Sequence, residues 1–325
     1  MPSFRLSLSA LLLSALLCVI SAAHAQENSQ EKTPAIQVSV DRVNVGVIVT
    51  DSSGHFVEGL RREDFHIFDN GVEQPLTGFA TIVEPAQVLL LVESGPAVFF
   101  LGRSHLQGAG KLLNSLSPDD RIAIASYSRN PELLFDFSQD KPTALLALQS
   151  LNFMAGFSDL NLSASLASAI DWLAALPGKK TVVLLSTGID TSRPENWEVI
   201  QRKLNTSDVR ILAVSLSGDF RKPAKHRKLS PQEREDRAFV KQGFAEADQS
   251  LHQISEATGG RVYFPRNQKE FEHAYAENAQ LVRHEYSIAF TPPARDGQIH
   301  TIKVKVKRFW SHVDHRQAYL APAPT

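Results

Sequence analysis

The sequence predicts an α/β protein in which a doubly wound parallel sheet is flanked by β-structure from both ends of the chain. Two observations lead to this fold class. In the middle of the chain, short unbroken apolar runs alternate with stretches of helical spacing. Near both ends, apolar and polar residues alternate with a period of two. Unbroken runs are typical of strands covered on both faces, and a period of two is typical of strands with one exposed face.

The central strands are predicted from four apolar runs at residues 88–92, 122–125, 182–185 and 209–214. Between them, apolar or small residues recur every three to four positions, which predicts helices. The two clearest helical sets are Leu106, Gly110, Leu113, Leu116 and Leu162, Leu166, Ile170, Leu173. Strands that alternate with helices indicate a parallel sheet, so residues 85–283 are interpreted as one α/β domain.

The two flanking segments are predicted to be β-structure. Residues 36–49 alternate with one shift near Asp41, which fits two short strands or one bulged strand, and residues 69–71 (Asp-Asn-Gly) fit a hairpin turn. Residues 36–84 therefore form an N-terminal β unit. Residues 284–325 form a C-terminal β segment, because three apolar residues alternate there with lysines from position 302 to 307. Residues 219–236 are rich in charge and are interpreted as a solvated insertion in the α/β domain.

The N-terminus has the three parts of a secretory signal peptide. Arg5 precedes an apolar run at residues 8–20, and Ala23-His24-Ala25 is a small-x-small cleavage site. We expect cleavage after Ala25, a flexible leader at residues 26–35, and a secreted or periplasmic protein. The apolar run is too short to span a bilayer comfortably, and no second long apolar run appears later, so no membrane insertion is expected after cleavage.

Composition excludes several functions. The chain has 34 basic and 35 acidic residues among its 325, and this balance gives no electrostatic reason to bind nucleic acid. Its single cysteine, Cys18, lies in the predicted signal peptide. An internal disulfide and a zinc site built on thiolates are therefore both excluded.

Motifs along nearly all of the mature chain resemble the bacterial von Willebrand factor type A-related family. They occur in four regions, in order: Val45 to Phe79 with Val49-Thr50-Asp51 and Phe68-Asp69-Asn70-Gly71, then Gly178-Lys179-Lys180 to Ser186-Thr187-Gly188-Ile189-Asp190-Thr191, then Ala257-Thr258-Gly259-Gly260-Arg261, then Tyr286-Ser287-Ile288-Ala289-Phe290. The resemblance implies a Rossmann-like sheet with helices on both faces, and β segments from the two chain ends that pack together. It also implies an exported interaction protein rather than an enzyme.

The family's characteristic site is a metal-ion-dependent adhesion site at the carboxyl edge of the sheet. It consists of an Asp-x-Ser-x-Ser turn, a threonine from a second loop and an aspartate from a third. Oxygen ligands of this kind suit a hard divalent cation. The chain departs from this pattern in every loop: the first reads Val92-Glu93-Ser94-Gly95-Pro96, the second has Leu160 at the threonine position, and the third has Thr187 at the aspartate position. We therefore expect no tightly held metal and no other cofactor.

The favoured function is a non-catalytic module that binds another protein through this edge. The predicted rim comprises Glu93, Ser94, Pro96, Phe157, Ser158, Asp159, Thr187 and Asp190. Phe99 and Phe100 fit either the rim or the core face of a helix.

Two alternatives remain open. A metal-dependent adhesion module would hold Mg²⁺ or Ca²⁺ with Glu93, Ser94, Asp159 and Asp190 as substitute ligands. A serine hydrolase would use Ser94 with His252 or His284, although Val92 and Pro96 are not the small neighbours that a nucleophile elbow needs.

Overall fold

The computed structural model describes residues 42–99, 104–153, 159–192, 194–218 and 230–324. The signal peptide and leader predicted for residues 1–35 lie outside this part of the chain, as does the strand predicted for residues 36–40. Phe100, Phe157, Ser158 and residues 219–229 of the predicted insertion also lie outside it. Within the described residues, none of the helices combines the length and the apolarity needed to cross a lipid bilayer.

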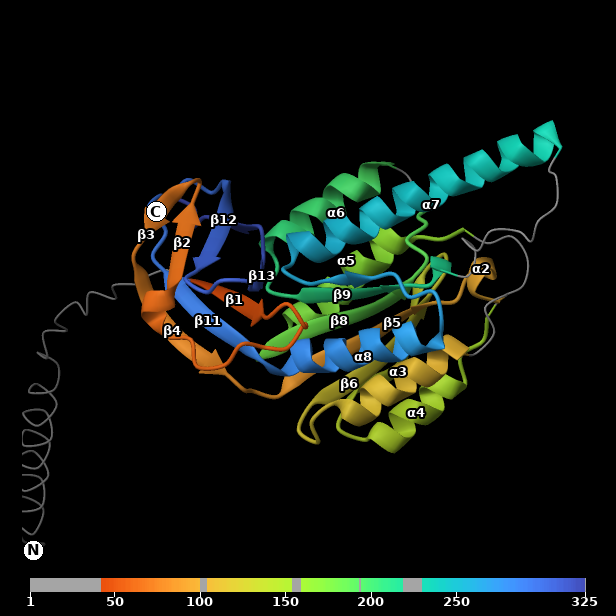
Figure 1. Ribbon diagram of the computed structural model, residues 1–325, viewed down its shortest axis with the longest axis horizontal. Helices are drawn as coiled ribbons and strands as arrows, with labels where there is room; N and C mark the ends of the chain where they lie inside the picture. The colour runs from red at the N-terminus through yellow and green to blue at the C-terminus, as the bar shows by residue number, and fades with distance from the viewer. Residues whose placement is uncertain (1–41, 100–103, 154–158, 193, 219–229, 325) are drawn as a thin grey trace, which may run out of the picture. The chain divides into compact units, whose positions relative to one another are not determined.

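A six-stranded sheet forms the centre of the α/β domain (Figure 1). In spatial order its strands are β10 (Val262–Tyr263), β9 (Arg210–Ser215), β8 (Lys179–Ser186), β5 (Ala86–Glu93), β6 (Arg121–Tyr127) and β7 (Pro131–Ser138). All neighbours are parallel except β6 and β7. The predicted parallel sheet is confirmed, and β7 is an antiparallel edge strand that was not predicted. The short connection between β6 and β7 permits only a hairpin, since a parallel crossover needs a dozen or more residues.

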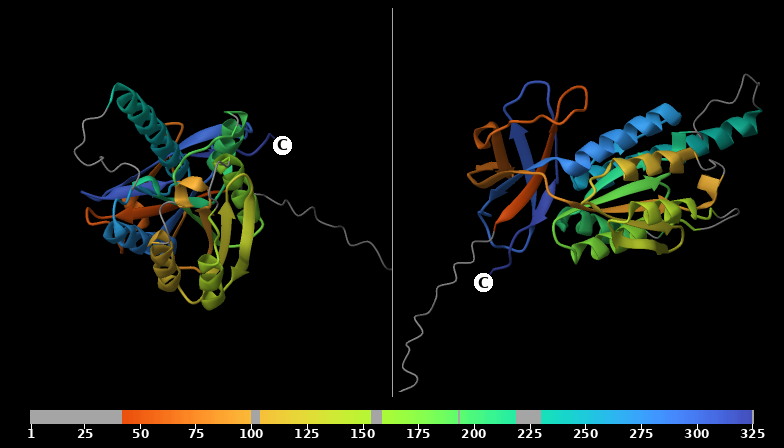
Figure 2. Two further views of the ribbon diagram at one scale, coloured as in Figure 1. Left: turned by 90° about the vertical axis from the view of Figure 1, so that its right-hand side faces the viewer. Right: turned by 90° about the horizontal axis from the view of Figure 1, so that it is seen from below.

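Helices cover both faces of this sheet (Figures 1 and 2). One face carries α3 (Ser104–Ser115), α4 (Lys141–Gln149) and α8 (Gln268–Arg283), and the other carries α5 (Leu162–Ala174), α6 (Pro194–Thr206) and α7 (Pro231–Ala257). Alternate residues of β5 serve the two cores: Leu90 packs with the first set of helices and Leu89 with the second. Burial on both faces explains the unbroken apolar runs in the sequence.

Helix α7 begins earlier than predicted. Residues 231–236 were assigned to a solvated insertion, but they form the first turns of the helix. Ser230 and Glu233 form a capping box, in which Ser230 Oγ accepts from Glu233 N at 3.2 Å and Glu233 Oε2 accepts from Ser230 N at 2.8 Å. Pro231 occupies the first helical position, where it is well tolerated. These local signals start the helix despite its high charge.

The two chain ends build one β unit, as the resemblance implied. The first sheet has the order β13 (His312–His315), β1 (Val43–Thr50), β11 (Glu285–Phe290), β4 (Leu76–Ile82), and the second has the order β14 (Ala318–Leu320), β12 (Ile299–Val306), β2 (Phe65–Asp69), β3 (Val72–Gln74). Strands from the two chain ends alternate in the first sheet, and in the second sheet they meet at the β12–β2 pair (Figure 2). The predicted hairpin turn joins β2 to β3, with positive φ angles of 46° at Asn70 and 84° at Gly71.

Polar contacts join the β unit to the sheet. Arg261, from the Thr-Gly-Gly-Arg motif, donates from Nε to Asp314 Oδ2 at 2.7 Å and from Nη2 to Thr50 Oγ1 at 2.6 Å. Gly259 has a φ of 69°, and a Cβ there would lie 2.4 Å from the backbone carbon of His315. The glycine is therefore required where α7 ends against β13.

Candidate functional site

Three neighbouring parallel strands end together at the carboxyl edge of the sheet. Glu93 ends β5, Tyr127 ends β6 and Ser186 ends β8, with Glu93 opposite Tyr127 in the register. Ser94 and Thr187 follow directly. The structure therefore places Glu93, Ser94 and Thr187 at this edge, where the sequence predicted them. Binding sites in open α/β sheets generally lie at this edge.

The Glu93 carboxyl group is buried at the centre of a hydrogen-bond network and does not face solvent. Its exposed fraction is 0%, as is that of Thr187. Oε2 accepts from Thr187 N at 2.7 Å and lies within 3.3 Å of the Tyr127 hydroxyl, and Thr187 Oγ1 lies 3.0 Å from Oε1 and 2.9 Å from Oε2. Ser186 Oγ links the network, 2.7 Å from the Tyr127 hydroxyl and 3.2 Å from Glu93 Oε2.

Burial raises the pKa of Glu93 above its ordinary value, because removal from water disfavours the charged form. The hydrogen bonds from Thr187, Ser186 and Tyr127 oppose that shift. The same burial raises the pKa of Tyr127, so its hydroxyl stays protonated and able to donate. The side chains of Glu93 and Thr187 are therefore internal supports of the edge and are not accessible to a partner.

Ser94 is held by the backbone. Its N–H and its hydroxyl both donate to the Tyr127 carbonyl oxygen, at 2.8 and 3.0 Å, and the residue is buried. Leu160 packs over the next residue, where a Cβ on Gly95 would lie 2.4 Å from the leucine Cδ2. The two histidines considered as a general base for Ser94 contact other side chains: His252 packs against Phe264 with tilted rings, and His284 stacks on Phe56 of the β unit.

Asp190 ties the loop after β8 to the start of α5. Its Oδ2 accepts from Ser163 N at 2.9 Å and from the Ser163 hydroxyl, and its Oδ1 accepts from Ser192 N at 2.8 Å. A carboxylate at the N-terminus of a helix satisfies free N–H groups and interacts favourably with the helix dipole. The Asp190 side chain is thus partly buried and structurally engaged.

The remaining rim residues are separate from this network. Asp159 is exposed and forms an ion pair with Arg129 at 3.1 Å, and Pro96 is partly exposed at the start of α2 (Pro96–Phe99). Of the predicted rim, the accessible described positions are therefore Pro96, Asp159 and, in part, Asp190.

These residues do not fit the oxygen cage of an adhesion-site cation. Glu93 is surrounded by donors, including the Thr187 N–H, whereas a metal site needs several converging acceptors. Asp159 and Asp190 each bind different partners, and in the described part of the chain no three His, Cys, Asp or Glu side chains come close enough to share an ion. The substitute cage of Glu93, Asp159 and Asp190 is thus not assembled.

Millimolar Mg²⁺, Mn²⁺ or Ca²⁺ is therefore expected to leave the thermal unfolding midpoint of this protein unchanged. A cation held by the folded state would raise it, since a ligand stabilises the state that binds it. The measurement is a thermal-shift titration after treatment with EDTA. A saturable rise that disappears in the Glu93→Gln variant would contradict this expectation.

A groove that the sequence did not reveal lies beside Asp190. It has a volume of about 510 Å³ and lies between residues 188–190 and α7. Phe239 and Val240 line it and are 80% and 51% exposed. Gly188 permits the close approach of loop and helix, because a Cβ there would lie 2.5 Å from the Ala247 carbonyl oxygen. The sequence signal that could have indicated this groove is the adjacent apolar pair Phe239-Val240 within a charged stretch.

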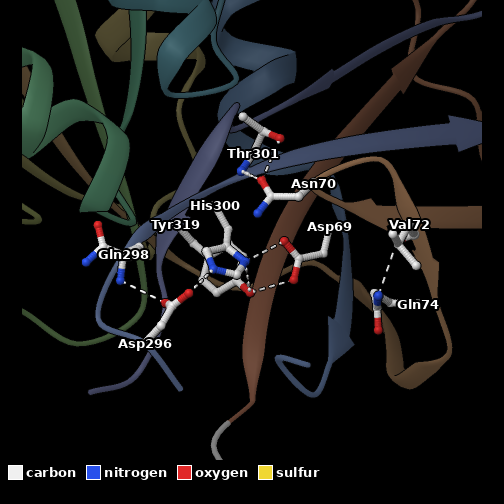
Figure 3. Close-up of polar contacts among 9 residues, drawn as sticks. All are labelled: Asp69, Asn70, Val72, Gln74, Asp296, Gln298, His300, Thr301 and Tyr319. Carbon is white, nitrogen blue, oxygen red and sulfur yellow. Dashed lines mark hydrogen bonds and ion pairs between the residues drawn. The ribbon is translucent and has the colours of Figure 1, made fainter. Parts of the chain in front are cut away.

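A second cluster that sequence reasoning missed is buried in the β unit (Figure 3). His300 Nδ1 lies 2.8 Å from Asp69 Oδ1, and His300 Nε2 lies 3.1 Å from Asp296 Oδ2. Tyr319 donates its hydroxyl to the second oxygen of Asp69 at 3.0 Å. Asp69 and His300 lie far apart in sequence, on β2 and β12, so no local motif could have indicated the pair.

Comparisons with known protein families and with curated proteins find no match to this chain. Solved structures do match in fold. The von Willebrand factor type A protein from Catenulispora acidiphila is 11% identical with a TM-score of 0.45, over 88% of this chain and 75% of that one. The minor pilin PilB from Streptococcus sanguinis is 11% identical with a TM-score of 0.46, over 64% and 63%.

A third match is proximal thread matrix protein 1 from the mussel byssus, whose structure has a zinc-occupied adhesion motif. It is 14% identical with a TM-score of 0.44, over 64% of this chain and 49% of that one. These similarities concern the fold alone. Besides its largely parallel sheet, the described part of the chain has two four-stranded antiparallel sheets.

Proposed function

We propose that this chain is a non-catalytic, exported interaction module of von Willebrand factor type A kind that binds another protein at the carboxyl edge of its sheet without a metal ion. Export rests on the signal peptide predicted at residues 1–25. The interaction class rests on the family motifs in the sequence. The proposed location of the partner-binding site rests on the groove beside Asp190.

The observation that carries the proposal is the exposed apolar pair on α7. Phe239 is 80% exposed on a helix whose first turns extend beyond the sheet (Figure 1). Exposed aromatic residues that line a groove are typical of interaction sites, where one or two such side chains supply most of the binding energy. Glu246 also lines this groove, so a partner that offers an apolar side chain next to a basic one would fit it.

The carboxyl network explains how the edge keeps its shape without a cation. In a metal-dependent site, the ion links the three loops. Here, Glu93 links β5 to Thr187, and Asp190 links the same loop to α5. Charge and hydrogen bonding that belong to the chain itself would therefore hold the edge in one arrangement.

The test is site-specific cross-linking in intact cells. A photo-reactive phenylalanine analogue at position 239 is expected to form a covalent adduct with one partner, which mass spectrometry identifies. The same analogue at Leu146, which is 65% exposed on α4, is the matched control and is expected to give no adduct with that partner.

The identified partner then allows a quantitative check. With both proteins purified, Phe239→Ala is expected to weaken binding by about tenfold or more, as for a truncated hot-spot residue. Leu146→Ala is expected to leave the Kd unchanged, and circular dichroism would show that both variants fold. A Phe239→Ala variant that binds with an unchanged Kd would refute the proposed site.

A further inference from the structure

A cavity of about 360 Å³ lies where the amino ends of β8 and β9 meet the β unit, away from the carboxyl edge. Its lining includes Gly46 and Glu285 from the β unit and Lys179, Ser207 and Arg210 from the α/β domain. This volume is within the range of pockets that bind small molecules.

The cavity is lined by more cations than anions. The cationic residues are Lys179, Lys180, Arg210 and Arg316, and the anionic ones are Glu84, Asp208 and Glu285. Two of the cations have strong partners. Lys180 binds Asp208 at 2.8 Å, and Arg210 binds Glu285 at 3.0 Å. The Arg210 side chain also donates to the carbonyl oxygens of Gly46 and Gly259.

The other two cationic side chains, on Lys179 and Arg316, and the Ser207 hydroxyl each have a buried donor atom without a hydrogen-bond partner. These atoms are Lys179 Nζ, Arg316 Nε and Ser207 Oγ. The Lys179 side chain is only 5% exposed, and its nearest carboxylate oxygen, on Glu285, is 3.7 Å away. Arg316 uses a different nitrogen to bind the Asn44 carbonyl oxygen at 2.7 Å.

Most buried donors in folded proteins have a hydrogen-bond partner, and a bound water or ion is one way in which such a donor is satisfied. A buried ammonium group without a hydrogen bond is costly, because the interior solvates it poorly. Glu285 cannot compensate Lys179 fully, since the same Oε2 atom already accepts from Arg210 at 3.0 Å. All three donors belong to residues that line the same cavity.

We propose that this cavity binds a small anionic molecule through a phosphate or carboxylate group, with Lys179 Nζ, Ser207 Oγ and Arg316 Nε as its donors. Charge-assisted hydrogen bonds to an oxyanion are the strongest that these side chains can form. Gly46 leaves room for the charged groups around the cavity, because a Cβ there would lie 2.8 Å from Glu285 Oε2 and 3.2 Å from an Arg210 nitrogen.

Protonation of Lys179 sets the expected pH range. Burial lowers the pKa of Lys179 to about 8, and Arg210 adds to that effect, whereas Glu285 and Asp120 oppose it. Lys179 in turn lowers the pKa of His284, whose burial acts in the same direction. Lys179 is therefore mostly charged at pH 7 and loses its charge above pH 8, so anion affinity should fall across that interval.

The experiment is isothermal titration calorimetry of the folded chain with inorganic phosphate and, separately, with succinate. Sodium chloride at matched ionic strength controls for screening, and glycerol controls for a neutral ligand. Saturable heat with phosphate alone assigns a phosphate ligand, and saturable heat with succinate alone assigns a carboxylate ligand. If neither anion gives more heat than chloride, the proposal is wrong.

Variants of the donors complete the test. Lys179→Met and Ser207→Ala are each expected to weaken anion binding by about tenfold or more, as loss of a charged or buried donor does. Lys203→Met is the matched control, because that lysine pairs with Asp171 on the surface and does not line the cavity. Unchanged affinity in Lys179→Met would overturn the assignment.

A stability measurement separates this role from a merely structural one. Without anion, Lys179→Met is expected to have an unfolding midpoint equal to or above that of the unmodified chain, because it removes a buried charge while Glu285 keeps Arg210. A lysine that only supports the fold through Glu285 would instead give a lower midpoint when replaced. Between pH 7 and pH 9.5 succinate keeps its charge, so an affinity that stays constant over that range would exclude Lys179 as a donor.

Discussion

Glu93→Ala should lower the free energy of unfolding by about 3 kcal/mol or more, because it leaves several buried donors without an acceptor. The Thr187 N–H, the Thr187 hydroxyl and the Tyr127 hydroxyl all lie within hydrogen-bond distance of this carboxyl group. Chemical denaturation monitored by tryptophan fluorescence would measure the loss. Glu93→Gln has nearly the same shape and keeps one acceptor oxygen, so it should retain most of the stability at pH 7.

The ionisation of Glu93 also makes the free energy of unfolding depend on pH, in a direction that can be predicted. The folded-state pKa of Glu93 is raised by burial, so the folded state holds the proton more tightly than the unfolded state. Its contribution to stability is therefore present at low pH and is lost as the pH rises from about 4.5 through the folded-state pKa. Glu93→Gln should remove this slope. An alanine variant as stable as the unmodified chain, or a glutamine variant with the same slope, would contradict the account of the network.

Asp69→Ala is the second substitution with a large expected effect. Asp69 is buried and accepts from both His300 and Tyr319 (Figure 3). Its removal should cost about 3 kcal/mol or more, since it leaves the Tyr319 hydroxyl and His300 Nδ1 without their buried acceptor. Urea denaturation would measure the change. Asp296→Ala is the matched control, because Asp296 contacts the same imidazole from a more exposed position and should cost much less.

His300 gives this cluster its own pH dependence. The hydrogen bond to Asp296, followed by that to Asp69, raises the pKa of His300 above its ordinary value, against the effect of burial. A raised histidine pKa contributes stability below pH 6.5 that is lost as the pH rises through the folded-state value. His300→Gln should therefore show a flatter stability profile between pH 6 and pH 8. Equal slopes in the two proteins would show that the imidazole is not protonated in the fold.

The central fold could be predicted from the sequence because its signals are local. The apolar runs of β5 and β8 are unbroken since each strand is buried on both faces, and the Asn-Gly pair at residues 70–71 is a hairpin signal contained in two adjacent residues. The edge strand β7 was missed because it is neither continuously apolar nor regularly alternating, with a mixture of exposed and half-buried residues. The position of β7 beside β6 follows from the short loop between these two strands and not from the pattern of apolar and polar residues in β7.

The candidate sites were harder to predict because their geometry depends on contacts between distant segments. A glutamate at the end of a strand is ordinarily solvated, and Glu93 is buried only because β6 and β8 end beside it with hydroxyl groups. The order of motifs did predict that Glu93 and Thr187 share one edge. Their direct contact, and the positions of Lys179 and Arg316 on one cavity, could not be read from spacing.

The interleaving of chain ends in the β unit has a consequence for how this protein is made. β1 finds its partners in β11 and β13, and the Leu60 N–H reaches the hydroxyl of Tyr286, 226 positions further along the chain. The α/β domain is continuous in sequence, so a growing chain can complete it first. The early strands must then wait, with unpaired edges that are prone to pair with other chains. Completion of the β unit therefore waits for the synthesis of β11 to β14, and a chaperone that shields β1 to β4 until then would help most.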